Sequence, residues 1–550
     1  MQKIIYLIIF LTFFLGYSQK EKSSILIPNT KKNLKLTDQE TLNWHHKDII
    51  DDTIPGISLE KAYRELIGSK KGKEVIIAVI DTEVDISHKD LKDQIWHNPK
   101  EVPDNNIDDD HNGYIDDIHG WNFLGNNKGE NVIYTNYEFV RIIREFKTIF
   151  KNKTIDDIPD TLKEDFKQYQ KAFKALEEKL ASNYNRLKRI KNILVEHRQI
   201  QKELKEYLST DSITKEQLLD FRPNDTIVEK HRKKLLYHLD SGFSEKSILG
   251  YINQTKGALK LSINLEYKER EIVGDNPNDI TDTNYGNNNV SGNLDKLYHG
   301  TLVSGVLAAK RNNTIGIDGI INEAKIMALC ISANGDELDK DIALAIRYAV
   351  DNGAKIINMS SGKQFSINRQ WVNKAIEYAA KKDVLFITSA GNNKLNLDEQ
   401  ENNYYPNDNT DLEISNNFLM VGASTYTLDK KLRYYLTNYG KNNVDIFAPG
   451  YKIYTTLPNN TYRYSQGTSM ATPIVAGVAA LIRSHYPNLK AYQIKEILMK
   501  SGISYNIDVE MTLKDDTKKM IPFSDLSKSG KIVNAYNALL MAEQVSKGTE

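Results

Sequence analysis

Short apolar runs alternate with amphipathic segments through much of the chain. A nearly continuous apolar run indicates a strand that is buried on both faces, as in a parallel sheet covered by helices. Apolar residues at helical spacing indicate the covering helices. We therefore predict an α/β fold built on a doubly wound parallel sheet. The predicted strands lie near 75–80, 326–331, 355–359, 384–388 and 419–421, and the predicted helices near 57–66, 337–350, 371–381, 491–499 and 533–545.

A different pattern fills residues 130–272, which are rich in lysine and glutamate and contain few glycines. From Leu162 to Leu180, apolar residues recur with alternating spacings of four and three, and the pattern resumes after Asn183. This spacing predicts an amphipathic helix of the coiled-coil type, with a second helix near 229–239. We predict an antiparallel helical insertion that stands on the α/β domain, near the face that carries its functional site. It is either a solvated spacer or a lid, docking arm or folding aid, and the sequence does not choose among these.

The N-terminus resembles an export signal. Lys3 precedes an apolar run at 4–15, and small residues follow at Gly16 and Ser18. The run is too short for an ordinary membrane span, so we predict a signal peptide at 1–18 that is cleaved before Gln19. After this cleavage we expect no integral membrane segment. The expected protein is exported to a periplasm or outside the cell, and residues 19–54 form a short N-terminal segment.

Length, charge and cysteine content limit the possible classes of protein. The chain of 550 residues is long enough to bury a large core, and its 73 Lys+Arg balance its 73 Asp+Glu. A net charge of zero gives no reason to expect a nucleic-acid partner or an anionic membrane surface. Cys330 is the only cysteine, so no intrachain disulfide is expected. It lies in an apolar strand, where we interpret it as part of the core.

The residues 467–473 carry the strongest chemical signal. Ser469 stands at the start of an apolar helix, Gly467 allows a tight turn before it, and Pro473 falls near the first helical turn. A serine here either caps the helix or presents its hydroxyl outward as a nucleophile, with the positive end of the helix behind it. The heptapeptide alone does not decide between these two roles.

Two further segments favour the catalytic role. Asp81 ends the apolar run 75–80, and His299 opens a helix of small residues after an Asn-rich loop. Each residue alone has an ordinary structural explanation. Together, the chain order Asp81, His299 and Ser469 is one of the known arrangements of a serine-hydrolase triad, with each residue at the end of a predicted element.

With these segments in place, the chain resembles the subtilisin-like serine proteases (subtilases, peptidase family S8). The resemblance covers roughly 55–125 and 275–505. It implies a subtilisin-like, three-layer, doubly wound parallel sheet, with a peptidase domain formed by 55–129 and 273–550. The large helical insertion at 130–272 then separates the catalytic Asp from the catalytic His. Further matching segments, in family order, are 389–392, 421–424, 438–440 and 445–450.

The resemblance implies hydrolysis of polypeptide substrates by acyl transfer, with no cofactor for catalysis. Ser469 attacks the carbonyl carbon, His299 moves the proton, and Asp81 holds the imidazole. The Asn392 side chain is implied as an oxyanion donor, and geometry suggests the Ser469 N–H as the second donor. The implied substrate-binding residues are Ser360, Ser361 and Gly362, which pair with the substrate backbone, and Ala390 and Gly391, which help to enclose the side chain before the cut.

Three hypotheses follow from these residues. The first is an active, secreted serine endopeptidase. The second is a catalytically silent relative that binds a protein partner through its helical insertion. The third is another serine hydrolase, such as an esterase or a peptide ligase. The complete triad and Asn392 favour the first hypothesis over the second.

Several positions depart from the family pattern, Glu83 and Leu302 among them. Glu83 stands where the family usually has glycine, and Leu302 replaces a histidine that is common three residues after the catalytic one. Glu83 introduces strain if this backbone needs a positive φ, and it also brings a second carboxylate toward the triad. Neither residue belongs to the triad, so we expect an influence on activity and not its loss.

The acidic segment 108–117 predicts a structural calcium ion. Asp108, Asp110, Asn112 and Asp116 occupy the first, third, fifth and ninth positions of a loop similar to an EF-hand. The twelfth position holds His119, where a bidentate glutamate is expected. An Asp- and Asn-rich turn without a metal is the alternative.

Overall fold

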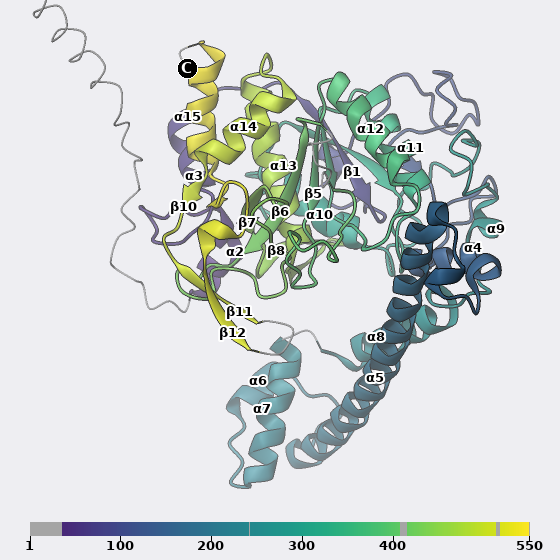
Figure 1. Cartoon of the computed structure of the whole chain (residues 1–550). Helices are drawn as coiled ribbons and strands as arrows, with labels where there is room; N and C mark the ends of the chain where they lie inside the picture. The colour runs from purple at the N-terminus through teal and green to yellow at the C-terminus, as the bar shows by residue number, and fades with distance from the viewer. Residues whose placement is uncertain (1–35, 241–242, 408–414, 513–516, 549–550) are drawn as a thin grey trace, which may run out of the picture.

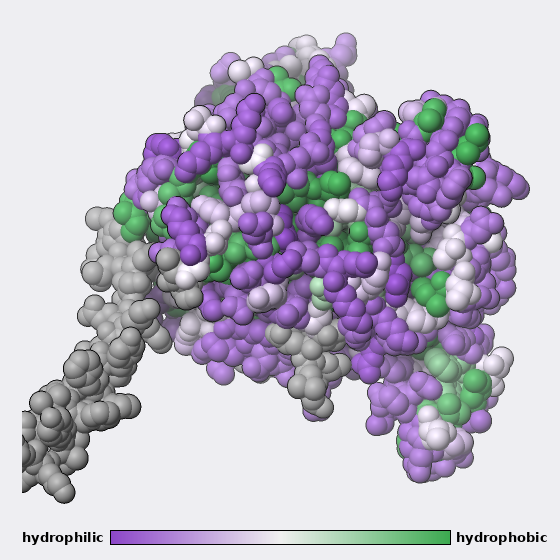
Figure 2. All heavy atoms as spheres, turned by 90° about the horizontal axis from the view of Figure 1, so that it is seen from above, coloured by the Kyte–Doolittle hydropathy of each residue, from purple (hydrophilic) through white to green (hydrophobic). Residues whose placement is uncertain are grey.

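The computed structural model describes residues 36–240, 243–407, 415–512 and 517–548 (Figure 1). The predicted signal peptide at 1–18 lies outside the described residues. Among the helices in the described ranges, none combines the length and the apolar character that crossing a membrane requires. Seen from above, the surface is mainly hydrophilic, with hydrophobic residues in small groups (Figure 2).

A nine-stranded sheet forms the centre of the molecule. The strand order is β10-β13-β7-β6-β5-β4-β1-β3-β2, and every adjacent pair is parallel except β10–β13. The central strands are buried along nearly their whole length, as their continuous apolar sequences predict. The strands are β1 Val75–Asp81, β2 Gly120–Asn122, β3 Ala324–Cys330, β4 Ile356–Met359, β5 Leu385–Ser389, β6 Phe418–Ser424, β7 Ile446–Pro449, β10 Ile503–Ser504 and β13 Lys531–Ile532.

Helices cover both faces of this sheet, so the predicted three-layer α/β fold is confirmed (Figure 1). One apolar core contains residues of α3, α10, α13, α14 and α15, and the other contains residues of α11 and α12. Cys330 is buried in the first core, as expected. The helices are α3 Leu59–Ala62, α10 His299–Ala308, α11 Asp339–Asp351, α12 Arg369–Lys381, α13 Thr468–His485, α14 Ala491–Ser501 and α15 Ala535–Ser546.

Smaller elements surround the three layers. The part of 19–54 that the structure describes packs on the domain, because Trp44 is fully buried and its indole N–H donates to the Tyr451 carbonyl at 3.0 Å. Two antiparallel hairpins add to the periphery. These elements are α2 Asp38–Asn43, β8 Ile453–Leu457, β9 Thr461–Ser465, β11 Asp508–Thr512 and β12 Lys518–Pro522. Short 3-10 turns occur at Trp44–His46, Lys92–Gln94, Ile155–Asp157, Asp160–Leu162 and Phe523–Asp525, and π turns at Tyr63–Ile67 and Ala258–Ser262.

The predicted helical insertion is present and extends away from the sheet (Figure 1). Its longest helix, α5, has 46 residues and continues through Asn183, whose amide donates to the Lys179 carbonyl at 2.9 Å. Helix α7 runs antiparallel to α5, since His231 pairs with Glu203 while His238 contacts His197. The helices of the insertion are α4 Glu138–Phe150, α5 Lys163–Leu208, α6 Lys215–Asp220, α7 Thr226–Asp240, α8 Glu245–Gly257 and α9 Arg270–Val273.

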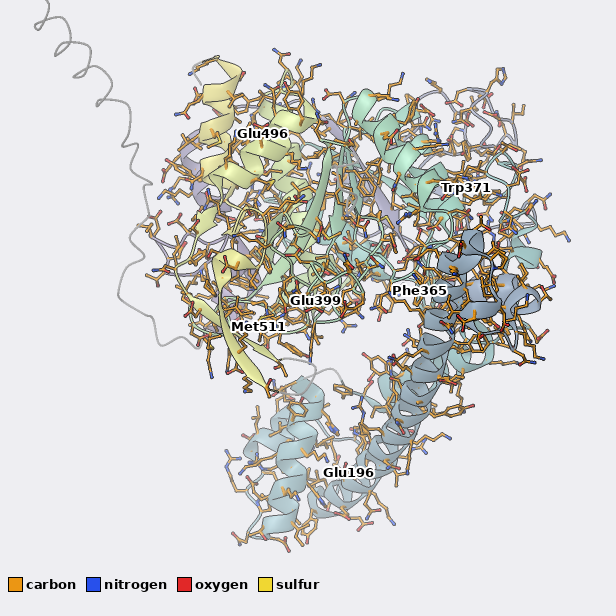
Figure 3. All side chains as sticks on the ribbon, in the orientation of Figure 1. Glu196, Phe365, Trp371, Glu399, Glu496 and Met511 are labelled. Atoms are coloured by element: carbon orange, nitrogen blue, oxygen red, sulfur yellow. The ribbon has the colours of Figure 1, made fainter. Side chains whose placement is uncertain are left out.

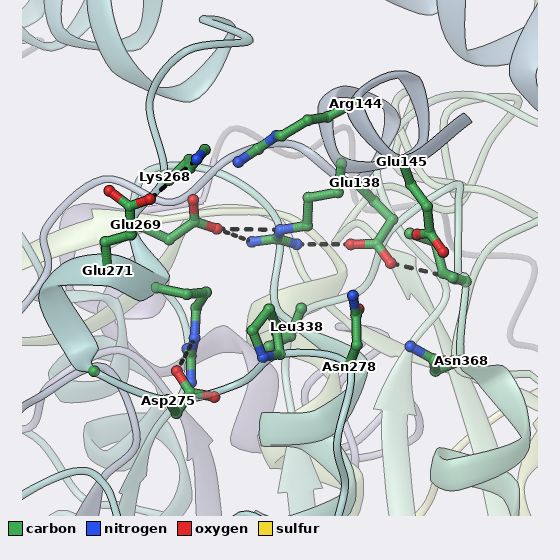
Figure 4. Close-up of a pocket in the computed structure, with 15 residues that line it drawn as sticks. Glu138, Arg144, Glu145, Lys268, Glu269, Glu271, Asp275, Asn278, Leu338 and Asn368 are labelled. Atoms are coloured by element: carbon green, nitrogen blue, oxygen red, sulfur yellow. Dashed lines mark hydrogen bonds and ion pairs between the residues drawn. The ribbon is translucent and has the colours of Figure 1, made fainter. Parts of the chain in front are cut away.

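Buried ion pairs link residues at the base of the insertion with one another (Figure 4) and with the domain. Arg141 lies between Glu138 at 2.6 Å and Glu269 at 2.8 Å. Lys363 follows β4, and its ammonium group contacts Asp339 at 2.8 Å and Glu138 at 3.3 Å. Charges this deeply buried are tolerated when each is paired, so the two parts of the chain depend on each other here.

Aromatic contacts reinforce the same junction. Phe365 lies between the domain and the base of the insertion (Figure 3), with its ring centroid 6.1 Å from that of Phe139. The Lys171 ammonium of α5 lies 5.6 Å from the Phe365 ring centroid, and it also donates to the Glu401 carbonyl at 2.9 Å. The root of α5 therefore lies against the loops that follow the central strands.

Candidate active site

Asp81 and His299 meet at the carboxyl edge of the sheet. Asp81 ends β1, which lies between β3 and β4, and its side chain is buried. His299 is the first residue of α10, and its Nδ1 lies 2.7 Å from Asp81 Oδ1 and 3.0 Å from Oδ2. The Thr82 N–H also donates to Asp81 Oδ1, at 2.7 Å. The carboxylate therefore holds the imidazole in one orientation.

Gly300 explains why α10 can begin so close to β1. A Cβ added to this residue would lie 2.5 Å from the Thr82 carbonyl oxygen and 2.8 Å from that of Glu83. The Gly300 N–H instead donates to the Thr82 hydroxyl at 2.8 Å. A glycine after His299 thus permits the close backbone approach that brings the histidine to Asp81.

The charge around His299 favours its protonated form. Burial of the ring opposes the imidazolium, but attraction to Asp81, the hydrogen bond to Asp81 and the charge of Glu337 outweigh this effect and raise the His299 pKa. Glu337 is a buried residue between β3 and α11, and its Oε1 accepts from the Ser332 hydroxyl at 2.7 Å. The sequence analysis did not identify Glu337, because nothing in its local sequence indicates its proximity to the histidine.

Ser469 lies in the first turn of α13, directly after a strained turn. Gly467 has a φ of 124°, which favours glycine, and a Cβ there would lie 3.1 Å from the Asn392 amide nitrogen. The Thr468 N–H donates to Asn392 Oδ1 at 3.0 Å, and the Thr468 hydroxyl accepts from the Gly391 N–H at 3.2 Å. Thr468 therefore ties the start of α13 to the loop that carries Asn392.

The structure brings only part of the predicted triad into contact. In the described part of the chain, no hydrogen bond joins Ser469 to His299. Hydrogen bonds between catalytic groups are often long without substrate and shorten when substrate binds. The helices α10 and α13, which carry the two residues at their N-terminal ends, pack against each other in one core. The catalytic roles of the three residues stay predictions.

Asn392 is exposed at the end of a rigid loop after β5. Gly391 has a φ of 93°, and its carbonyl accepts from the Asn438 N–H at 2.8 Å. The Asn438 side chain donates to the Ala390 carbonyl at 2.7 Å. The segment around Asn438, one of those that carry the family resemblance, thus holds the loop in place.

The second predicted substrate-binding segment follows β4. Ser360 is buried and accepts a hydrogen bond from the Asn358 amide at 3.0 Å, whereas Ser361 and Gly362 are partly exposed. Because β4 and β5 are adjacent and parallel, Gly362 and Gly391 leave the same edge of the sheet as neighbours. The pairing of this segment with a substrate stays a prediction.

Glu83 and Leu302 have structural roles. Glu83 lies outside the left-handed region, so a residue other than glycine causes no backbone strain here. Its buried carboxylate accepts from the Asn293 side chain at 3.1 Å and from the Asn131 side chain at 3.3 Å, and burial raises its pKa. It fixes the loop that leads to His299 and is not among the charges that shift the histidine. Leu302 is buried within α10.

The acidic loop forms a cluster that includes one residue the sequence analysis missed. Oxygens of Glu101, Asp108 and Asp110 all lie within 4.8 Å of one another. Glu101 is only 5% exposed, and its Oε2 has no hydrogen-bond partner. Three carboxylates this close repel one another, and burial followed by the charges of Asp117 and Asp110 raises the Glu101 pKa. Hard oxygen ligands around an unpaired buried oxygen suit Ca²⁺.

The other two predicted ligands lie differently. The Asn112 side chain donates to Asp117 at 2.9 Å and accepts from the Tyr114 N–H at 2.8 Å. The Asp116 carboxylate accepts from the backbone N–H of Asn106 at 2.8 Å. The structure therefore brings Asp108 and Asp110 together with Glu101. Asn112 lies against this cluster, because its backbone N–H donates to Asp108 at 3.0 Å and to Asp110 at 3.2 Å, whereas Asp116 is not among the clustered carboxylates.

These elements define an α/β protein that carries an Asp–His pair at one edge of its sheet. A serine in the first turn of a helix lies at the same edge. The pattern of the subtilase family matches residues 72–520. The chain belongs to the subtilase family.

Three relatives illustrate the similarity. The chain is 33% identical over 247 residues to "Thermophilic serine proteinase" of Bacillus sp. (strain AK1). This match covers 45% of this chain and 53% of the relative. It is 34% identical to "Subtilisin-like protease 1" of Plasmodium vivax, covering 44% and 40%, and 37% identical to "Thermitase" of Thermoactinomyces vulgaris, covering 34% and 61%. The chain thus spans roughly half the length of these relatives.

Proposed function

We propose that this chain is a serine endopeptidase that hydrolyses polypeptides through Asp81, His299 and Ser469. The observation that carries the proposal is the 2.7 Å contact between His299 and the buried Asp81, at the sheet edge where α13 also begins. Membership of the subtilase family and the serine protease names of its relatives support the same reaction.

In this mechanism the Ser469 Oγ attacks the scissile carbonyl carbon while His299 Nε2 accepts its proton. The C–N bond then breaks, the same proton passes to the leaving amine, and an acyl-enzyme remains on Ser469. A water attacks this ester, with His299 again accepting a proton, and the carboxylic acid product leaves. Asp81 stays ionised and stabilises the imidazolium that forms in each half of the reaction.

The oxyanion requires donors that are already in position. The Thr468 N–H holds the Asn392 carbonyl oxygen, which leaves the Asn392 NH₂ group for the substrate oxyanion. The Ser469 backbone N–H, at the free N-terminal end of α13, is the proposed second donor. Fixing these groups before the substrate arrives avoids their reorganisation during the reaction.

We further propose that the protein is exported and that a calcium ion stabilises it at Glu101, Asp108 and Asp110. Export rests on the sequence pattern at 1–18, and the substrates would then be proteins of the periplasm or the extracellular medium. The metal rests on the unpaired Glu101 oxygen among neighbouring carboxylates. Its proposed role is to neutralise this cluster, and catalysis does not pass through it.

The triad is tested by comparing wild type, Ser469→Ala and the control Ser465→Ala on unfolded casein. Removing the nucleophile of such a triad reduces kcat by roughly 10⁶-fold, so Ser469→Ala should show no detectable cleavage. Ser465→Ala, which changes β9 just before the turn, should retain activity. A serine-directed phosphonate should label wild type at residue 469 by mass spectrometry.

The same experiment separates the alternatives. A folded wild-type protein that neither cleaves casein nor reacts with the phosphonate would contradict the proposal and favour the binding protein. Labelling at 469 with hydrolysis of esters but not of casein would favour another serine hydrolase. Casein cleavage that persists in Ser469→Ala would place the nucleophile elsewhere.

A further inference from the structure

The two glycines that border the predicted pocket face one aromatic ring. Gly362 follows β4 and Gly391 follows β5, the two parallel neighbours in the sheet. A Cβ added to Gly362 would lie 2.5 Å from Tyr404 Cε1, and a Cβ added to Gly391 would lie 2.5 Å from Tyr404 Cε2. Because Cε1 and Cε2 are on opposite edges of the ring, the ring spans the space between the two segments.

Several contacts hold Tyr404 in this position. The neighbouring Tyr405 exchanges backbone hydrogen bonds with Lys363, at 2.7 Å and 3.0 Å. The Asn407 side chain donates to the Tyr404 carbonyl at 3.0 Å, and the Tyr404 hydroxyl lies beside the side chain of Ser389, the last residue of β5. Tyr404 is only 8% exposed. It is therefore a fixed part of the structure and not a surface side chain.

A cavity lies on one side of the ring. Its volume is about 350 Å³, and it is lined by Gly362, Asn393 and Tyr404 together with Lys179 and Ser182 of the insertion helix α5. Neither Gly391 nor Ala390 is among the described residues that line it. The Tyr404 ring therefore borders this cavity and also lies against Gly391, and α5 supplies part of the cavity wall.

We infer that Tyr404 determines substrate specificity by restricting the residue before the cut to a small side chain such as glycine, alanine or serine. The inference rests on the proposed peptidase function and on the predicted pocket between residues 360–362 and 390–391. A large side chain that enters between these segments meets the Tyr404 ring. A small one leaves the ring undisturbed.

The cavity also predicts what happens when the ring is removed. In Tyr404→Ala, the space between Gly362 and Gly391 joins the cavity bounded by α5. The combined space accepts a phenylalanine side chain, so the variant gains activity toward a substrate that wild type rejects. Tyr404→Phe keeps the ring and loses only the hydroxyl beside Ser389, and it is the matched control.

The experiment uses two peptides that are identical except for alanine or phenylalanine before the cleaved bond. We expect wild type and Tyr404→Phe to prefer alanine in kcat/KM. In Tyr404→Ala, the ratio should move toward phenylalanine by about 10- to 200-fold, the range that a modest change in an apolar pocket produces. Circular dichroism and phosphonate labelling establish that each variant is folded and competent.

Two results overturn the inference: a wild-type preference for phenylalanine, or an unchanged ratio in folded Tyr404→Ala. If Tyr404→Ala does not fold, the wild-type preference alone decides. Failure of the proposed function looks different, because wild type then shows no cleavage that depends on Ser469. Casein cleavage that requires Ser469, together with an unchanged ratio, overturns only the role of Tyr404.

Discussion

At the scale of single residues, Glu337 acts on His299 by its charge. It is buried beside the site, where the low dielectric strengthens its attraction for the imidazolium. The catalytic base must be neutral to accept a proton from Ser469. Because the His299 pKa is raised, activity should begin to fall at a higher pH than it would with an unperturbed histidine.

We predict that Glu337→Gln moves the acid limb of the pH–kcat/KM profile to lower pH. The variant removes one charge that raises the His299 pKa, while Asp81 and the acceptor for Ser332 remain. The profile of the free enzyme reports this pKa directly. Glu510→Gln, which changes an acid of the β11–β12 hairpin, is the control and should leave the limb in place. An unchanged limb in Glu337→Gln would contradict the role of Glu337.

At the scale of elements, the insertion contains a histidine contact that should respond to pH. The Nδ1 atoms of His197 on α5 and His238 on α7 lie 3.1 Å apart, and both side chains are buried. Burial lowers the pKa of each, and the charge of His197 lowers that of His238 further. Three other charged groups face this contact. Lys234 lowers the His238 pKa and Glu196 raises it, while Glu245 raises the His197 pKa.

We predict that α7 opens more readily as the pH falls from about 7.5 to about 5.5. The folded pKa values lie below the ordinary histidine value of ~6.5, so the opened form binds protons first and stability is lost as the pH falls through this range. Hydrogen exchange of residues 226–240 measures the opening. His238→Gln should weaken the pH dependence, whereas the exposed-site control His97→Gln should not. Equal protection of these amides at both pH values in wild type, after correction for the pH dependence of intrinsic amide exchange, would exclude the effect.

At the scale of the whole molecule, the acidic cluster links local charge to global stability. The cluster lies in the long connection between β1 and β2, and β2 is an edge strand of the central sheet. A ligand that binds only the folded state stabilises it by about 2.7 kcal/mol at a concentration 100 times its Kd. A bound cation at Glu101 would therefore raise the melting temperature of the whole domain.

We predict that a chelator lowers the melting temperature of wild type and that added calcium restores it. Glu101→Gln should lose most of this calcium dependence, because it removes the charge of the buried carboxylate whose Oε2 has no hydrogen-bond partner. Asp104→Asn changes an exposed acid of the same connection and serves as the control that keeps the dependence. Calorimetry with calcium or with chelator makes the comparison. Identical melting of wild type in both conditions would remove the support for a metal site.

The sequence by itself determined the layers and the central chemistry. Continuous apolar runs such as 75–80 can be buried only within a covered sheet, and the observed β1 and β3–β6 lie where these runs predict. The heptad-like spacing from Leu162 to Leu180 likewise predicted α5, although not its full length, since a polar Asn183 on a helix does not have to end it. Asp81 and His299 were identified because each stands at the end of an element.

Only the tertiary structure decided which distant residues come together at the predicted active site and at the acidic cluster. Glu337, Tyr404 and Glu101 carry no local pattern that separates them from ordinary acids and aromatics. Their importance comes from burial and from contacts across long stretches of chain, such as the Tyr404 ring between Gly362 and Gly391. Amphipathic spacing also leaves open where a helix docks, whereas the buried pairing of Lys363 with Glu138 and Asp339 decides that the insertion is rooted beside the active site. Periodicity reports local burial, while proximity depends on how the whole chain folds.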